Sequence, residues 1–441
     1  MEIYEGDKRN LKLVAAGDLL ISRRLSLYNE PRYRAIIDAI RDADVSFANL
    51  EVLIHNFEGY PSEHSGGNYM AMPPYVAGEL KWAGFNLLSR ANNHAGDYSA
   101  GGLAATSRHL DEAGLAHAGV GENLARARAP VYLEIQRARV AMLSISSTCP
   151  PGSRAGQQRP DLQGRPGANG LRHKAVYRVS SQTISHLRVA SEELGWERYK
   201  REMVSRGVQA PEDDTRCELL GRVFVAHEKP GIHTTPDPQD TKAMVDGIRA
   251  ARRQADFVLV SVHSHERDED LQMPANFMQV FCRACVDAGA DAIIGHGPHV
   301  LRGIEIYQGR PIFYSLGNFV YQSQTLDFLP ADIFERFGLD ELRSYPADAF
   351  DARYNGDGLR REPRWWQSLL VKCEYEASKL TAVSLIPVTL GRHAHRAQQG
   401  RPLLANDEEA MEILSRVQRL SEPFGTRIEL TNGLGAVALG G

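Results

Sequence analysis

The stretch DAIIGHGPHVL, residues 291–301, contains a predicted buried strand followed directly by two histidines, and the fold and the chemistry of this chain depend on this combination. Its first apolar residues have the composition of a short buried strand, and a glycine ends the run. His296 and His299 follow on a turn formed by a glycine and a proline. Because open α/β sheets bind ligands beyond the carboxyl ends of their strands, this stretch predicts two imidazoles at such an edge.

Four further apolar runs end in the same kind of residue, one that can bind a metal ion or move a proton. Each residue alone has an ordinary explanation, since an aspartate after a strand is usually a turn residue or a helix N-cap. Repetition at five strand ends favours a shared site instead. The candidates, in chain order, are Asp18, Glu51, Asn93, His94, His263, His296 and His299.

The composition is that of a large globular protein. The 441 residues are 43% hydrophobic with a net charge of −4, which indicates neither a nucleic-acid nor a membrane-surface partner. No apolar run reaches the roughly 18 residues of a membrane span, and the charged first residues do not form a signal peptide, so we expect a cytoplasmic protein. Cys282 and Cys285 follow a helical apolar rhythm and are predicted to be buried thiols. The oligomeric state stays open.

Strands and helices alternate along most of the chain, which predicts a layered α/β sheet with right-handed crossovers. The expected strands are 11–17, 45–50, 85–89, 115–118, a hairpin over 131–146, 257–262, a hairpin over 303–315, 369–374 and 380–387. The expected helices are 31–42, 75–83, 100–113, 239–253, 276–288 and 407–420.

A core domain is expected over residues 11–321, interrupted at 150–235 by an insertion that would serve as a lid or a substrate wall. A second irregular insertion follows at 322–363. Residues 364–441 are expected to complete the same domain with two strands and a helix, and their apolar end is expected to fray. The arginines of the first insertion that could grip substrate carboxylates, although solvated loop charges are the commoner role, are Arg154, Arg159 and Arg165.

The candidate residues offer carboxylate oxygens, an amide oxygen and imidazole nitrogens. Such mixed oxygen and nitrogen ligands suit Zn²⁺, Mn²⁺ or Fe²⁺. They do not suit a structural zinc ion, which is usually bound by sulfur. We therefore expect one or two divalent metal ions. Two ions roughly 3.5–4 Å apart, bridged by a carboxylate, would activate water and polarise a substrate oxygen together.

With these residues placed, the chain resembles the CapA-like family (poly-γ-glutamate capsule synthesis type), a branch of the calcineurin-like metallophosphoesterase fold. The resemblance implies a four-layer αββα sandwich that holds a dinuclear site. The matching segments are AAGDLLI (15–21), ANLEV (48–52), ANNHAGDY (91–98), VSVHSHE (260–266), GHGPHVL (295–301) and YSLGNFVY (314–321).

Carried over residue by residue, the resemblance implies that Glu51 is a carboxylate that bridges two metal ions. The remaining implied ligands are Asp18 and His299 for one ion, and Asn93, His263 and His296 for the other.

Beside the ligands, the resemblance implies that His94 acts as an acid, a base or an oxyanion stabiliser, oriented by Asp97. Two departures from the family bear on this chemistry. The D-x-H that opens the phosphoesterase branch has Leu20 in place of its histidine, so one metal site loses an imidazole. The common H-W-G after the fourth strand reads H-S-H, which adds the ionisable ring of His265 near the metals.

Three activities remain open. The first is a metal-dependent hydrolase that cleaves an amide, peptide or γ-glutamyl substrate through metal-activated water. The second is a cytoplasmic metal-dependent peptide epimerase in which His94, Asp97 or His265 exchanges a Cα proton. The lost imidazole and the lack of a membrane anchor favour this activity. The third is a non-catalytic factor in capsule polymer biosynthesis. We predict hydrolysis first, on a peptide-like or anionic small substrate.

Overall fold

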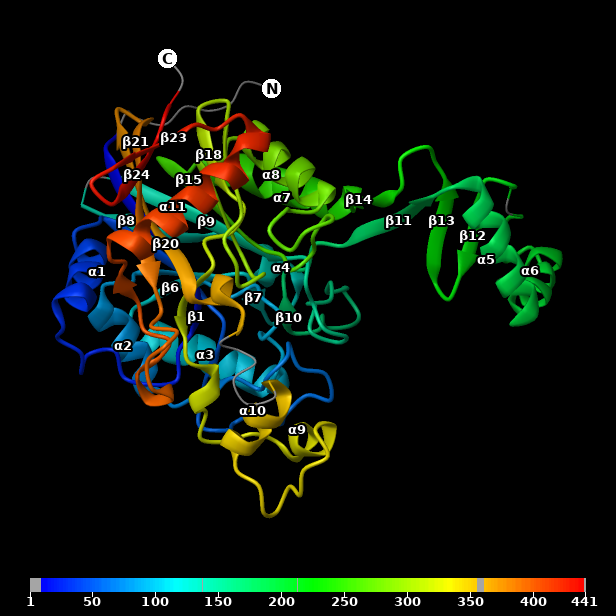
Figure 1. Ribbon diagram of the computed structural model, residues 1–441, viewed down its shortest axis with the longest axis horizontal. Coiled ribbons are helices and arrows are strands. Elements are labelled where there is room, and N and C mark those ends of the chain that lie inside the picture. The colour runs from blue at the N-terminus through cyan, green and yellow to red at the C-terminus, as the bar shows by residue number, and fades with distance from the viewer. Residues whose placement is uncertain (1–8, 137, 212, 355–360, 440–441) are drawn as a thin grey trace.

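The computed structural model describes residues 9–439 except 137, 212 and 355–360. Two sheets pack face to face and helices cover their outer faces (Figure 1). In the described residues, the first sheet runs β23 (Ile428–Thr431), β24 (Leu434–Val437), β21 (Lys379–Thr389), β20 (Gln367–Glu376), β1 (Leu11–Leu20), β2 (Val45–Leu50), β5 (Leu87–Ser89) and β6 (Ala116–Ala118), with β19 (Asn318–Tyr321) beside β1 and β22 (Leu403–Leu404) beside β21. The second sheet runs β17 (Ile304–Tyr307), β18 (Arg310–Phe313), β16 (Ala292–His296), β15 (Phe257–His263), β9 (Ala138–Ser146) and β8 (Val131–Ile135).

The central strands are buried on both faces, because successive side chains of a strand point to opposite layers. On β1, Leu13 and Ala15 pack between the two sheets, whereas Val14 and Ala16 pack in the outer layer with apolar residues of helices. The outer helices are α1 (Pro31–Arg41), α2 (Tyr75–Ala83) and α3 (Ser99–Glu112) on the first sheet, and α7 (Pro238–Arg252) and α8 (Asn276–Asp287) on the second. The predicted four-layer αββα sandwich is confirmed.

Several predicted elements coincide with the observed ones. The strand expected at 45–50 is β2, and the helix expected at 75–83 is α2. β1 pairs parallel with β2, and β15 pairs parallel with β16, as crossover connections require. Cys282 and Cys285 are buried free thiols on α8, as predicted.

The chain end differs from the prediction. Instead of fraying, β23 and β24 form a hairpin that pairs with β21, and α11 (Asp407–Ser421) packs its apolar face into the core between the sheets. The turn is made by Asn432 and Gly433, both with positive φ. Asn-Gly between two apolar runs is a strong signal for a two-residue hairpin turn, so this hairpin was predictable from the sequence.

The first insertion contains a sheet that was not expected from the sequence. β11 (His173–Val179), β12 (Arg216–Leu219), β13 (Arg222–Ala226) and β14 (Gly231–Pro236) form a four-stranded sheet, on which α5 (Ser181–Glu193) packs, and α6 (Trp196–Ser205) packs against α5. We call residues 173–236 the arm. Figure 1 shows the arm, in green, projecting to the right of the sandwich. The predicted role as a lid or substrate wall therefore finds no direct support here and stays a prediction.

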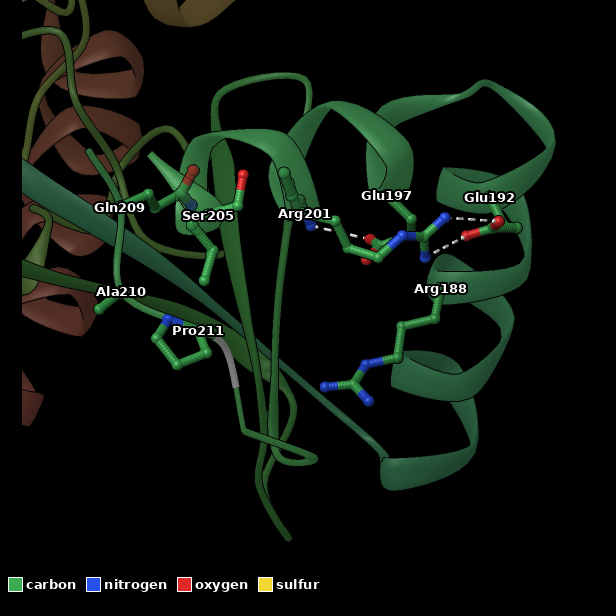
Figure 2. A pocket seen from close by; sticks show the side chains of 10 residues that line it. Arg188, Glu192, Glu197, Arg201, Ser205, Gln209, Ala210 and Pro211 are labelled. Carbon is green, nitrogen blue, oxygen red and sulfur yellow. Dashed lines mark hydrogen bonds and ion pairs between the residues drawn. The ribbon is translucent and has the colours of Figure 1, made fainter. Parts of the chain in front are cut away.

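The arm contains a hollow between α5 and α6 (Figure 2). Its charges are paired within the arm: Arg201 lies 3.1 Å from Glu192, and Lys200 lies 3.0 Å from Glu197. The second insertion contains two short helices, α9 (Ala331–Arg336) and α10 (Pro346–Tyr354), and part of the segment expected to be irregular lies outside the described residues. Over the described ranges, the helices are too short or too polar to cross a membrane.

We predict that the arm can be removed without unfolding the sandwich. Ala175 and Thr234 are paired across β11 and β14, so an Asn-Gly turn can replace residues 176–233. Thr234 should be kept, because its hydroxyl accepts a hydrogen bond from the backbone N–H of Phe277. The shortened protein should unfold cooperatively, with Tm within roughly 5 °C of the full chain by calorimetry. Loss of the cooperative transition would show that the arm belongs to the folding unit.

Candidate metal centre

Four strands bring predicted ligands to one place. Asp18 lies near the end of β1, where the register to β2 shifts, and Glu51 directly follows β2. His263 and His296 are the last residues of the neighbouring strands β15 and β16 and pair with each other. Because the strands within each pair are parallel, their carboxyl ends meet at the same edge.

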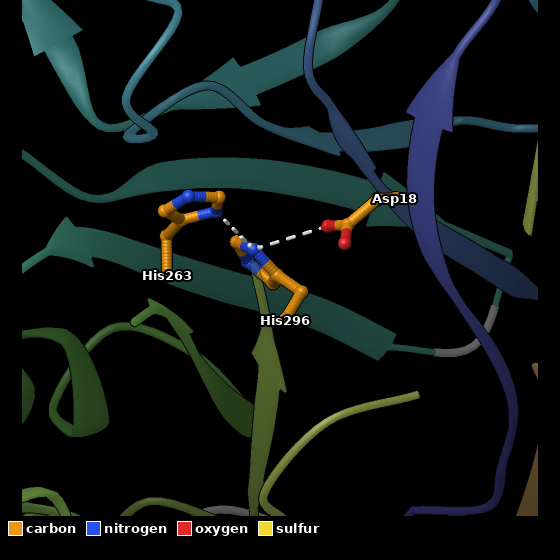
Figure 3. Close-up of side chains that lie close together, drawn as sticks. All are labelled: Asp18, His263 and His296. Atoms are coloured by element: carbon orange, nitrogen blue, oxygen red, sulfur yellow. Dashed lines mark hydrogen bonds and ion pairs between the residues drawn. The ribbon is translucent and has the colours of Figure 1, made fainter. Parts of the chain in front are cut away.

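Asp18, His263 and His296 form the innermost group, with one possible ligand atom of each within 4.8 Å of the others (Figure 3). The two Nδ1 atoms of the histidines are 3.0 Å apart, and His296 Nδ1 lies 3.8 Å from Asp18 Oδ1. All three side chains are fully buried. Nitrogens that bind one Zn²⁺ at about 2.0–2.1 Å lie roughly 3 Å apart, so this spacing suits a shared cation.

Glu51 lies in two further groups of the same size, one with His263 and His265 and one with Asp18 and His299. Its Oε1 is 3.9 Å from His263 Nε2 and 3.8 Å from His299 Nε2. The Nε2 atoms of His263 and His265 are 3.0 Å apart. Glu51 therefore occupies a position from which one carboxylate could bridge two ions. His265, expected to be a base, lies among the possible ligands.

Two buried oxygen atoms of predicted ligands, Glu51 Oε1 and Asn93 Oδ1, have no hydrogen-bond partner within the described part of the chain. The Asn93 amide is held in this orientation because its Nδ2 donates to Gly66 O at 2.8 Å. A buried acceptor without a donor costs about 1–3 kcal/mol, and a bound cation would remove this cost at each oxygen that it reaches. The residues present thus fit a divalent metal ion.

The two buried carboxylates differ in their electrostatics. Burial, together with the charge of Asp18, raises the pKa of Glu51 well above its ordinary value. Burial acts on Asp18 in the same direction, but the hydrogen bond and charge of His299 outweigh it and hold the Asp18 pKa below its usual range. At neutral pH a proton or a cation must therefore compensate the second carboxylate.

The buried imidazoles are held neutral. Burial lowers the pKa of His263 well below its ordinary value, that of His296 to about 4 and that of His265 to about 3. The neighbouring rings add to this effect at His263 and His265. Neutral imidazole offers the lone pair that a metal ion needs, so these rings are in the binding form at neutral pH.

His94 and Asp97 form a buried pair beside this centre. Asp97 Oδ2 lies 2.6 Å from His94 Nδ1, and Asp97 Oδ1 accepts a hydrogen bond of 2.8 Å from the backbone N–H of Gly66. Asn92 ties the segment to the centre, because its Nδ2 donates to Asn49 Oδ1 at 3.1 Å. With Nδ1 engaged, Nε2 is the nitrogen of His94 available to a substrate.

Three residues hold the possible ligands in place and were not assigned a role from the sequence. Asn49 Nδ2 donates to Asp18 Oδ1 at 2.8 Å and lies 3.4 Å from Glu51 Oε2. Ser261 Oγ is 2.7 Å from His296 Nε2, and Asn318 Oδ1 is 2.9 Å from His299 Nδ1. Asn49 and Ser261 each lie two residues before a possible ligand, which puts them on the same face of a strand, and this spacing was the available signal.

Other predicted features lie outside the centre. Leu20 packs in the outer apolar layer, so the D-x-H position contributes no ligand. Arg159 pairs with Asp161 at the surface and is a solvated loop charge. Arg154 and Arg165 line a hollow of about 360 Å³ next to the loop that follows β9, and their grip on a substrate carboxylate stays a prediction.

The chain is similar to known bacterial proteins over the residues that form the metal centre. Residues 12–323 match the model of a family described as "Bacterial capsule synthesis protein PGA_cap". Uncharacterized protein y4sH of Sinorhizobium fredii (strain NBRC 101917 / NGR234) is 36% identical over 443 residues, 97% of this chain and 93% of that protein. Capsule biosynthesis protein CapA of Bacillus anthracis is 24% identical over 322 residues, 71% of this chain and 61% of that protein. PGA biosynthesis protein CapA of Bacillus subtilis (strain 168) is 42% identical over 106 residues, 24% of this chain and 26% of that protein.

We predict that Glu51→Gln uncouples stability from metal binding. The amide removes a carboxyl whose raised pKa makes it costly to bury without metal at neutral pH, so Tm in the presence of EDTA should rise by a few degrees. The stabilisation by Mn²⁺ or Zn²⁺, about 2.7 kcal/mol at 100 times Kd in the parent, should largely disappear. Thermal unfolding with and without metal, with metal analysis by mass spectrometry, measures both effects.

The matched control is Glu112→Gln, because the Glu112 side chain is 62% exposed. It should leave both quantities unchanged, since surface ion pairs contribute little. A Glu51→Gln protein that binds metal as tightly as the parent would contradict the assignment of Glu51.

Proposed function

The chain belongs to the bacterial capsule synthesis protein family PGA_cap, and from this premise we propose that it is a metal-dependent hydrolase of amide, peptide or γ-glutamyl bonds. The expected cytoplasmic location and the anionic, peptide-like substrate belong to the same proposal. The observation that carries it is a pair of buried oxygens, Glu51 Oε1 and Asn93 Oδ1, that have no hydrogen-bond partner among the described residues, in a site with neutral imidazoles.

A divalent ion bound at this centre would polarise the scissile carbonyl and lower the pKa of water there. Glu51 would be shared between two ions, because it lies within reach of both Asp18 and His263. His265 would act as a ligand rather than as a free base, since its Nε2 lies 3.0 Å from His263 Nε2. The full set proposed to hold metal is Asp18, Glu51, Asn93, His263, His265, His296 and His299.

His94 would supply the proton of the reaction. An amide nitrogen leaves only after it gains a proton, which a positioned imidazole can donate. Asp97 lies 2.6 Å from His94 Nδ1 and would fix the ring with Nε2 directed to the substrate. Asp97 is itself held by the backbone N–H of Gly66, so the pair would keep its geometry while the substrate changes.

A peptide epimerase is the second candidate, and Leu20 favours it. Without the imidazole of the D-x-H motif, one metal position has fewer ligands, and one ion is enough to acidify a Cα–H next to a carbonyl. His94 and His265 would then exchange the proton. Both rings lie close enough to His263 to lower its pKa, although burial is the larger cause.

We predict that the metal-loaded protein releases new amine ends from γ-glutamyl or peptide substrates in D₂O, without deuterium at Cα, as measured by mass spectrometry and NMR. His94→Gln should lower this rate by about 10²–10⁴-fold with unchanged metal content. Asn93→Ala serves as the metal-poor control. Phosphate esters belong in the same assay, because related folds cleave them.

The other outcomes are decisive as well. Deuterium at Cα without chain cleavage would replace the hydrolase by the epimerase. Neither product from any substrate, with metal bound, would contradict both activities and favour a non-catalytic factor in capsule polymer biosynthesis.

A further inference from the structure

Most side chains of the metal centre are buried, and the centre is partly exposed on one side. The side chains of Asp18, Glu51, His263 and His296 are fully buried, whereas that of His299 is 23% exposed. The exposed side of the centre therefore lies at His299, whose ring is 5.5 Å from that of the half-buried His265. Arg336 and Arg353 of the second insertion donate hydrogen bonds to the loop at Gly67 and Asn68, and α10 lies outside residues 12–323, the part that matches the family.

Arg353 of α10 approaches His94 across Gly67. Gly67 has φ of +151°, and a Cβ at this position would lie 3.7 Å from Arg353 Nη2 and 4.0 Å from His94 Cε1. The guanidinium and the imidazole thus flank the same small volume. A glycine here keeps that volume free of a side chain.

The loop at Gly66–Asn68 fixes Arg353 relative to the proposed catalytic pair. Arg353 Nη1 donates to Asn68 Oδ1. Two residues earlier, Gly66 donates its N–H to Asp97 and accepts a hydrogen bond from the Asn93 amide, both at 2.8 Å. One short segment therefore contacts the arginine, a proposed metal ligand and the carboxylate that orients His94.

The charge of Arg353 also acts on Tyr321, which neighbours His299. The Tyr321 ring lies 6.2 Å from the His299 ring. Burial raises the pKa of the Tyr321 phenol well above its ordinary value, and the nearby charge of Arg353 opposes this shift. Arg353 itself packs on the Tyr354 ring, with 5.2 Å between the guanidinium carbon and the ring centre.

Arg353 is half-buried and, among the described residues, forms no ion pair with a carboxylate. Its contacts engage Nη1 and the face of the guanidinium, and they leave Nη2 beside the volume next to His94. A guanidinium binds a carboxylate through two parallel hydrogen bonds. We propose that Arg353 binds a substrate carboxylate beside His94 and so selects anionic peptides. The inference rests on the proposed function and names the substrate class of that site.

The test compares penta-γ-glutamate with the same peptide in which the free carboxylates are carboxamides. Binding to the metal-loaded protein is measured by calorimetry, which requires no turnover. The parent should bind the acid more tightly than the amide. Arg353→Gln should weaken binding of the acid by roughly tenfold or more and that of the amide less than about twofold, with Arg353→Lys in between.

Arg343→Gln is the matched control, because Arg343 lies in the same insertion and its side chain is 86% exposed. It should change neither affinity. Tm and metal content confirm that each variant is folded. If Arg353→Gln does not fold, the role of Arg353 is tested by Arg353→Lys and by the preference of the parent for the acid peptide over the amide peptide.

Equal or absent binding of the two peptides by the parent, or an equal loss of both in Arg353→Gln, would overturn the role of Arg353. A different outcome separates the two proposals. If the parent binds the acid peptide selectively, loses this selectivity in Arg353→Gln and cleaves neither peptide, then the role of Arg353 stands and the hydrolase is contradicted.

Discussion

The burial of two carboxylates, Asp18 and Glu51, in the same place is the constraint on which the rest of the structure depends. Two like charges away from water repel each other strongly, and each has lost its hydration. The protein supplies only partial compensation through Asn49 and His299. Such an arrangement is costly in a metal-free protein and becomes favourable once a divalent cation is shared between the carboxylates. We therefore regard the sandwich as a scaffold whose stability supports a strained, charged centre.

The sandwich can hold this centre because its strands are apolar on both faces up to their last residues. β15 and β16 are buried along their whole length and end in His263 and His296, so the imidazoles cannot move without displacing the core. Serine and asparagine side chains on the same strand faces then orient the rings and carboxylates. The rigid part of the site thus comes from the sheets. The loop at Gly66–Asn68 and α10 add the part that would distinguish substrates.

Much of this could be predicted from the sequence, because the pattern of an apolar run followed by a polar residue is local. The strand before Glu51 and the convergence of Asp18, His263 and His296 followed from it. Contacts between distant segments could not be predicted in this way. Arg353 approaches His94 across Gly67, which lies almost three hundred residues earlier in the chain. The terminal hairpin was a different kind of miss, because its Asn-Gly turn was visible.

The central claim is that Glu51 and its neighbours share a cation. Anomalous diffraction from crystals of protein purified without chelator, recorded on both sides of the Mn, Fe and Zn absorption edges, tests it most directly. One or two anomalous peaks are expected within coordination distance of Glu51, His263 and Asp18, at about 2.0–2.3 Å from the nearest oxygen or nitrogen atoms. Crystals of metal-containing protein whose anomalous peaks all lie elsewhere, with these side chains bonded only to one another, would contradict it.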